Sequence, residues 1–314
     1  MKLKLLRLVS IITVLLLSKP AIGQEKYQGP IDDNTYLSTV RITKASQEKI
    51  SVKQKKKTIV VDSLIVSAGT GFFVFRRMPD ATSRIFLVTN KHMIGSWSLN
   101  DSLVTAKNVF VGFYTKNGLF KNITISLNDA TGKIAPYVHP YPNQVVDVVV
   151  IDITSFLSDI ALSDVALFGI PIENLVSLAN LNLCNIYTGS QVLIAGYPSG
   201  IGIASQSRPI IKSAIISSPL TTIDIIITIE NRNHQAVMNS LYGKIILIDG
   251  YIVGGNSGGP VFTPRDKIIS DPKVNLGQVN YVIGIVSSVY NNTGVSVLYS
   301  SDYIKDLIYQ YTKN

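Results

Sequence analysis

Short apolar runs, rich in β-branched residues and separated by turn residues, dominate the chain from residue 58 onward. Runs of this length bounded by glycine, proline, asparagine and aspartate are typical of β-strands. One segment differs: Ile304, Leu307, Ile308 and Tyr311 recur at helical spacing, after a serine, Ser301, that can cap a helix. The pattern predicts an all-β protein that ends in one amphipathic helix.

The N-terminus has the three parts of a secretory signal peptide over residues 1–23. Basic residues come first, an apolar run over 8–17 follows, and Ala21-Ile22-Gly23 offers a cleavage site before Gln24. The run is short for a bilayer span, which needs about 20 residues. We therefore expect an exported protein, periplasmic or secreted. A segment retained as an anchor is the alternative.

Removing the signal peptide changes the charge. The whole chain has 29 Lys and Arg against 20 Asp and Glu, a net charge of +9. Four of the basic residues lie in residues 1–23, so the remainder carries 25 − 20 = +5. This modest charge is weak evidence for an acidic partner. The lysine run over 53–57 has no interleaved aromatic residues, which favours a solvated hairpin tip over a nucleic-acid or lipid site.

Cysteine and histidine are scarce: Cys184 is the only cysteine, and there are three histidines. A single cysteine excludes an internal disulfide, which for an exported protein fits a bacterial envelope better than a disulfide-rich extracellular fold. With so few His and Cys residues, the sequence offers no metal-ligand cluster. We expect no metal, no cofactor and no nucleic-acid partner.

The stretch Gly254-Gly255-Asn256-Ser257-Gly258-Gly259-Pro260 suits neither a helix interior nor a strand interior. It suits a tight loop that presents one hydroxyl, that of Ser257, and directs backbone N–H groups at whatever lies above it. A serine nucleophile needs a base, and the base needs an orienting group.

Two residues upstream can supply these groups. His92 follows the apolar run over 84–89, and a histidine at a strand end can be exposed for function. Asp147 stands at the head of the β-branched run over 145–153, where a carboxylate is costly unless it is paired. Asp152 should face the opposite side and be a surface or turn-proximal charge. His139 lies beside Pro140 in a loop, and His234 lies in a polar stretch.

Three motifs carry a family resemblance: residues 88–94 around His92, 147–151 after Asp147, and 255–260 around Ser257. They resemble the motifs of trypsin-like (chymotrypsin-fold) serine peptidases, in particular the bacterial, disulfide-free branch related to the protease domain of HtrA-type proteins, here without a PDZ domain. Gly69-Thr70-Gly71-Phe72 and Gly196-Tyr197-Pro198 support the match. The resemblance implies two antiparallel six-stranded β-barrels and a C-terminal α-helix.

The resemblance also implies a domain division. Residues 1–23 are the signal peptide and 24–57 a leader with the first strand region. The N-terminal barrel, with His92 and Asp147, spans 58–170; a connector spans 171–189. The C-terminal barrel, with Ser257, spans 190–300, and the helix 301–314.

By the same resemblance the chain is a serine endopeptidase that cleaves a protein or peptide substrate. His92, Asp147 and Ser257 are the expected catalytic residues, with the backbone N–H groups of Gly255 and Ser257 as oxyanion hole. The expected substrate-binding residues are Tyr251, Ser287, Ser288 and Val289. Asn256 stands where many digestive relatives have an aspartate that pairs with a new N-terminus, so we expect no activation of that kind.

Two alternatives come from other classes. A trypsin-fold binding protein without catalysis usually lacks a triad member, and here all three candidates are present. An esterase would show Gly-x-Ser-x-Gly at a strand–helix turn, whereas Gly258-Gly259-Pro260 resists helix formation.

Overall fold

The computed structural model describes residues 33–54, 57–97, 103–115, 120–158, 165–200, 208–230, 236–264, 280–289 and 293–313. The expected signal peptide, His234 and residues 265–279 lie outside these ranges. Within them, no helix is long and apolar enough to cross a membrane.

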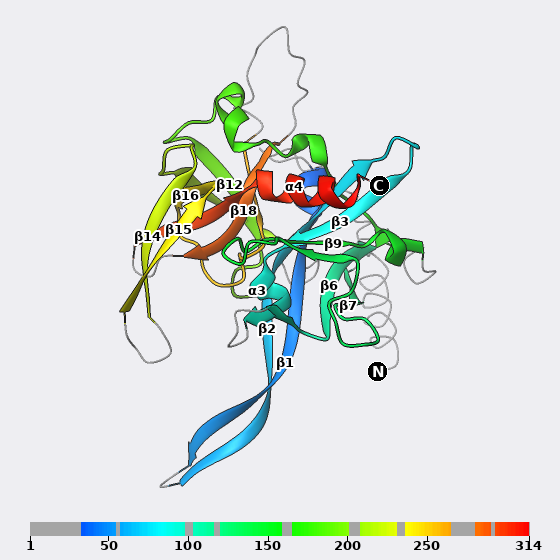
Figure 1. Ribbon diagram of the computed structural model, residues 1–314, viewed down its shortest axis with the longest axis vertical. Helices are drawn as coiled ribbons and strands as arrows, with labels where there is room; N and C mark the ends of the chain where they lie inside the picture. Colours follow the sequence, from blue (N-terminus) through cyan, green and yellow to red (C-terminus); the bar gives the residue numbers. More distant parts are fainter. Residues whose placement is uncertain are drawn as a thin grey trace, which may run out of the picture.

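The first half of the chain forms a nine-stranded, curled sheet (Figure 1). Its main path runs β10-β6-β1-β2-β3-β9-β8, with β7 paired to β6 and β11 paired to β2. Phe73, Leu87 and Ile151 of three neighbouring strands belong to one buried hydrophobic cluster. The strands are β1 (Thr39–Gln54), β2 (Lys57–Arg77), β3 (Ser83–Thr89), β6 (Asn108–Thr115), β7 (Phe120–Ser126), β8 (Val138–Pro140), β9 (Val149–Asp152), β10 (Val165–Ala166) and β11 (Ile170–Pro171).

Strands β1 and β2 continue beyond this sheet as a long hairpin that projects from the body (Figure 1). β1 pairs with β6 only over Ile42–Lys44, and β2 pairs with β3 only from Phe72 onward. The outer part is therefore a two-stranded ribbon. Gln54 pairs with Lys57 at its end, so the basic run lies at the hairpin tip, as expected.

The second half forms a closed six-stranded barrel in the order β12-β13-β16-β19-β18-β17. Antiparallel pairing of Leu193 with Phe262 closes it. Its strands are β12 (Gln191–Gly196), β13 (Ile210–Ile216), β16 (Ile245–Asp249), β17 (Pro260–Phe262), β18 (Val282–Val289) and β19 (Val295–Ser300). Two small hairpins accompany the main bodies: β4 (Gly95–Trp97) with β5 (Leu103–Thr105), and β14 (Ile223–Glu230) with β15 (Ala236–Gly243).

Sheet, barrel and C-terminal helix share one core. Phe86 of the sheet, Phe262 of the barrel and Leu307 of α4 (Ser301–Tyr311) belong to the same buried cluster. The all-β class with a C-terminal helix is confirmed. Only the second β body closes into a barrel. The remaining helices are α2 (Asp33–Leu37), α3 (Lys91–Ile94) and the 3-10 turns η1 (Thr154–Ser158), η3 (Ile172–Asn174), η4 (Leu178–Cys184) and η5 (Pro198–Gly200).

Three sequence-based predictions need correction. His139, expected in a loop, lies in β8 and is buried. The cap of α4 is Ser300, whose hydroxyl accepts from the Asp302 N–H, whereas Ser301 begins the helix and donates to the Val176 carbonyl. Asp152 is a buried residue rather than a surface charge, because Arg84 from β3 reaches across and pairs with its carboxylate. The expected place of Asp152 beside a turn is confirmed, because its Oδ1 accepts from the Thr154 N–H at the start of η1.

Candidate active site

His92 lies on α3, a single helical turn that directly follows β3. Its ring Nδ1 is 2.6 Å from Asp147 Oδ2, and its backbone N–H donates to Asp147 Oδ1 at 3.1 Å. The two oxygens of one carboxylate thus hold both the ring and the backbone of His92. This leaves Nδ1 protonated and directs the Nε2 lone pair away from Asp147, since a carboxylate only accepts hydrogen bonds. The imidazole is 42% exposed and can meet a substrate.

Asp147 lies two residues before the start of β9 and is held from several directions. Besides His92, the hydroxyl of Ser287 on β18 donates to Asp147 Oδ2 at 2.8 Å. The side-chain amide of Asn90 donates to the Asp147 backbone carbonyl at 2.6 Å. The carboxylate is therefore fixed by groups from both β bodies.

Ser257 lies in the loop between β16 and β17, on the barrel. Its hydroxyl donates to the backbone carbonyl of Ser287 at 3.1 Å. Within the described part of the chain, it makes no hydrogen bond to His92. Ser287 therefore contacts two of the three expected catalytic residues: its carbonyl accepts from Ser257 and its hydroxyl donates to Asp147.

The peptide groups around Ser257 are oriented by their carbonyls. The Gly254 carbonyl accepts from Ser199 N–H at 2.6 Å, and the Asn256 carbonyl accepts from Gly259 N–H at 2.9 Å. In a trans peptide, C=O and the following N–H point in opposite directions. The N–H groups of Gly255 and Ser257 therefore each point away from the carbonyl of their own peptide group. Neither has an acceptor among the described residues, so both are available to an oxyanion.

Thr70 of β2 ties this loop to the first sheet. Its hydroxyl donates to the Gly255 carbonyl at 2.6 Å and accepts from Tyr197 N–H at 3.0 Å. Its backbone N–H donates to the Ser257 carbonyl at 2.9 Å. The loop is thus held by a neutral contact across the two β bodies. The side-chain amide of Asn256 donates within the loop, to Val253.

Two glycines of the loop are required by close approach and by backbone conformation. Gly255 has φ +95°, and a Cβ there would lie 2.3 Å from the Tyr197 carbonyl oxygen. Gly258 has φ +85°, and a Cβ there would lie 1.9 Å from the Thr70 carbonyl oxygen. Residues with a side chain avoid this region of φ, and at both positions a carbonyl oxygen occupies the place where the Cβ would lie. Gly254 differs, because a Cβ there would meet nothing within 4 Å.

The four expected substrate-binding residues are distributed unevenly. Ser287 lies at the site, with its side chain on Asp147. Ser288 and Val289 continue β18 with exposed side chains. Tyr251 is 82% exposed, and Lys212 donates to its backbone carbonyl and lies over its ring. Within the described residues, no hydrogen bond joins Tyr251, Ser288 or Val289 to the three expected catalytic residues. Their role in binding stays a prediction.

Sequence reasoning did not single out Thr70 or Lys91 as parts of the site, and it assigned Ser287 to substrate binding rather than to a hydrogen bond with Asp147. Thr70 stands between Gly69 and Gly71, and such a pair of glycines indicates close approach of another backbone segment. This pair is the sequence signal that could have identified Thr70. The described residues contain no group of three His, Cys, Asp or Glu side chains that could hold a metal ion.

With this geometry in view, we compared the chain with known proteins. Residues 69–269 match the model of the trypsin-like peptidase domain family. The chain belongs to this family. It is a serine peptidase by family, and the matched range includes the His92, Asp147 and Ser257 motifs. No curated protein matched the sequence.

Solved structures of the Rv3671c protease from M. tuberculosis are similar to this chain. The active form is 17% identical, with 87% of this chain and 80% of that chain covered and a TM-score of 0.42. The inactive form is 16% identical, with 88% and 89% covered and a TM-score of 0.41.

Proposed function

We propose that the protein is an exported serine endopeptidase in which Ser257 attacks the peptide bond, His92 transfers protons and Asp147 orients His92. The observation that carries this proposal is the orientation of the loop around Ser257. The N–H groups of Gly255 and Ser257 each point away from a hydrogen-bonded carbonyl and lack an acceptor among the described residues. A loop held in that conformation without a ligand is ready to stabilise an oxyanion.

In the proposed reaction, the Ser257 hydroxyl turns from the Ser287 carbonyl toward His92 Nε2. His92 takes the hydroxyl proton as Oγ bonds to the substrate carbonyl carbon, and the carbonyl electron pair moves to oxygen. Asp147, which accepts from Nδ1–H, stabilises the imidazolium. The N–H groups of Gly255 and Ser257 stabilise the oxyanion; one such donor contributes about 3 kcal/mol to the transition state.

The intermediate then collapses. The C–N bond breaks, and His92 returns the proton to the leaving amine, which leaves an acyl ester on Ser257. Water, deprotonated by His92, adds to the ester carbonyl. The C–Oγ bond then breaks, Ser257 Oγ takes the proton back from His92, and the acid is released. The Ser287 hydroxyl keeps its hydrogen bond to Asp147 throughout and holds the carboxylate in position.

The experiment is labelling with a fluorophosphonate, beside hydrolysis of an unstructured protein such as casein. The chain that starts at Gln24 should label and hydrolyse casein without further processing. Ser257→Ala should not label, and its kcat should fall by about 10⁶. Ser213→Ala is the matched control. Ser213 lies on β13, and its hydroxyl accepts a hydrogen bond from the Gln191 side chain rather than contacting an expected catalytic residue. A wild type that does not label would favour a trypsin-fold binding protein. Labelling of Ser257→Ala would exclude Ser257 as the nucleophile.

Export has its own test. The full chain should be cleaved before Gln24 when it is expressed in a bacterium, and the product should leave the cytoplasm. Cell fractionation with mass spectrometry of the N-terminus measures both. A chain that keeps residues 1–23 in the membrane fraction would show the retained anchor instead.

A further inference from the structure

Lys91 is an unusual residue at the candidate site. It directly precedes His92, yet the residue is only 1% exposed, and its side chain is among the largest fully buried ones of the described chain. Lysine is almost never fully buried without a partner, because removing an ammonium from water is costly. A leucine or methionine would fill the same space without the free-energy cost of burying a charge. Packing alone therefore does not explain a lysine at this position.

The Lys91 ammonium donates to the backbone carbonyl of Asn143 at 2.7 Å. Asn143 begins the segment that leads to Asp147, and its carbonyl also accepts from Val146 N–H. Tyr299 of the barrel donates to the Val145 carbonyl in the same segment. Lys91 therefore fixes the start of a short loop whose end is the carboxylate that orients His92.

Three consecutive residues hold this loop. Asn90 donates to the Asp147 carbonyl, Lys91 to the Asn143 carbonyl, and His92 contacts the Asp147 carboxylate through two nitrogen atoms. Each contact joins the α3 turn to one segment of five residues. Only the middle one of the three uses a buried charge.

We propose that Lys91 is a positioning residue for the proposed catalytic pair: its buried ammonium holds the 143–147 loop so that Asp147 stays aligned with His92. The inference rests on the proposed function. It adds a residue that touches neither the substrate nor the reacting atoms and acts through Asp147.

The charges around Lys91 agree with this role. Burial lowers the pKa of Lys91 from 10.5 to about 8, and attraction to the Asp147 carboxylate opposes this shift. Lys91 therefore remains protonated at neutral pH. Lys44 of β1 brings a second ammonium to the turn, where it donates to the His92 and Gly95 carbonyls.

The test is Lys91→Met, which keeps the length of the side chain and removes its charge and donors. We expect kcat to fall at least about tenfold while KM stays within about threefold, because alignment matters most in the transition state. The far-downfield proton resonance of the His92–Asp147 hydrogen bond should weaken or disappear. The Tm should stay the same or rise, since an apolar residue replaces a buried charge.

Lys305→Met is the matched control. Lys305 on α4 also donates to a backbone carbonyl, that of Leu175, but away from the Asp147 loop. Its kcat and downfield resonance should match the wild type. An unchanged kcat in Lys91→Met would overturn the proposal, as would an equal loss in Lys305→Met. A Lys91→Met protein that melts well below the wild type or does not fold would also overturn it, because Lys91 would then be structural. A wild type that does not label with fluorophosphonate would refute the proposed function instead.

Discussion

The sheet and the barrel contribute different kinds of groups to the site. The sheet supplies the ionisable ones, His92, Asp147 and Lys91, whereas Ser257 and Ser287 on the barrel supply hydroxyls and peptide dipoles. Lys91 shows the cost of the first arrangement: the difference between pKa values of 10.5 and about 8 corresponds to about 3 kcal/mol of unfavourable charge burial at neutral pH.

On the barrel side, the positions of the functional groups are set by backbone conformation instead. The Gly255 φ of +95° and the carbonyl contacts of the loop set the direction of two N–H groups without any buried charge. The two halves should therefore respond differently to substitution. Changes in the sheet should act through charge and alignment, and changes in the barrel through steric fit of the loop.

The largest effect is expected on the barrel side. Gly255→Ala would bring a Cβ to 2.3 Å from the Tyr197 carbonyl oxygen at a φ that alanine avoids, so the peptide must rotate. We expect kcat to fall by about 10²–10³, the effect of losing one oxyanion donor, with little change in KM. Steady-state hydrolysis measures both.

Gly254→Ala is the comparison variant, since its added Cβ meets nothing within 4 Å. Its kcat should change by no more than a few-fold. A Gly255→Ala enzyme with normal kcat would mean that the loop conformation does not matter for catalysis, and the contrast between the two halves would fail.

Thr70→Val tests the connection between the two halves. Valine keeps the shape of threonine but removes the hydroxyl that joins the Gly255 carbonyl to Tyr197 N–H, and both groups are buried. We expect kcat to fall roughly tenfold as the loop loosens, because a tenfold change corresponds to about the free energy of one hydrogen bond. The same hydrolysis assay applies.

Thr263→Val provides the control for Thr70→Val. Thr263 is also a buried threonine whose hydroxyl accepts a backbone N–H, that of Tyr281, but it lies within the barrel. It should lower Tm without lowering kcat. If both variants lose kcat equally, the effect of Thr70 is one of general stability rather than of the loop.

The sequence predicted the components of the site better than their connections. A glycine-rich loop, a histidine after a strand and an aspartate before an apolar run leave local signals, and the structure brings His92 and Asp147 into direct contact. Thr70, Lys91 and the Ser287 hydroxyl act across pairings between distant segments, which local patterns do not encode. The burial of Asp152 was missed for the same reason, because its partner Arg84 lies 68 residues away.

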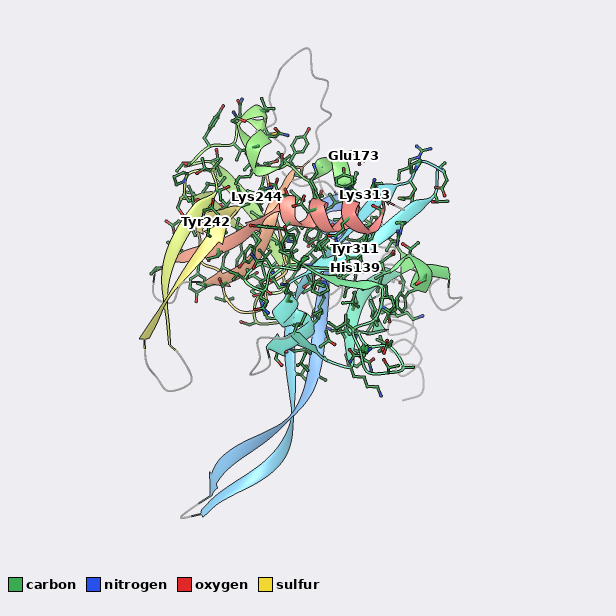
Figure 2. All side chains as sticks on the ribbon, viewed as in Figure 1. His139, Glu173, Tyr242, Lys244, Tyr311 and Lys313 are labelled. Carbon is green, nitrogen blue, oxygen red and sulfur yellow. The ribbon has the colours of Figure 1, made fainter. Side chains whose placement is uncertain are left out.

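The smallest effect is expected on the far side of the sheet, at His139. This residue is 7% exposed and stacks on Tyr311 of α4, with ring centroids 3.6 Å apart (Figure 2). Burial lowers the pKa of His139 below 6.5; Asp152 opposes the shift, and Arg84 adds to it. The folded state therefore keeps His139 neutral where the unfolded chain takes up a proton.

Linkage fixes the sign of this effect. The unfolded state binds more protons as the pH falls below about 6.5, so folding stability decreases there and stops decreasing below the lowered pKa of the folded state. His139→Phe keeps an aromatic ring against Tyr311 and removes the titration. Its Tm should fall less than that of the wild type between pH 7 and pH 5, with equal kcat at pH 7.5. Parallel Tm curves would show that His139 is charged or exposed in the folded protein, and a loss of kcat would show that the far side of the sheet does reach the site.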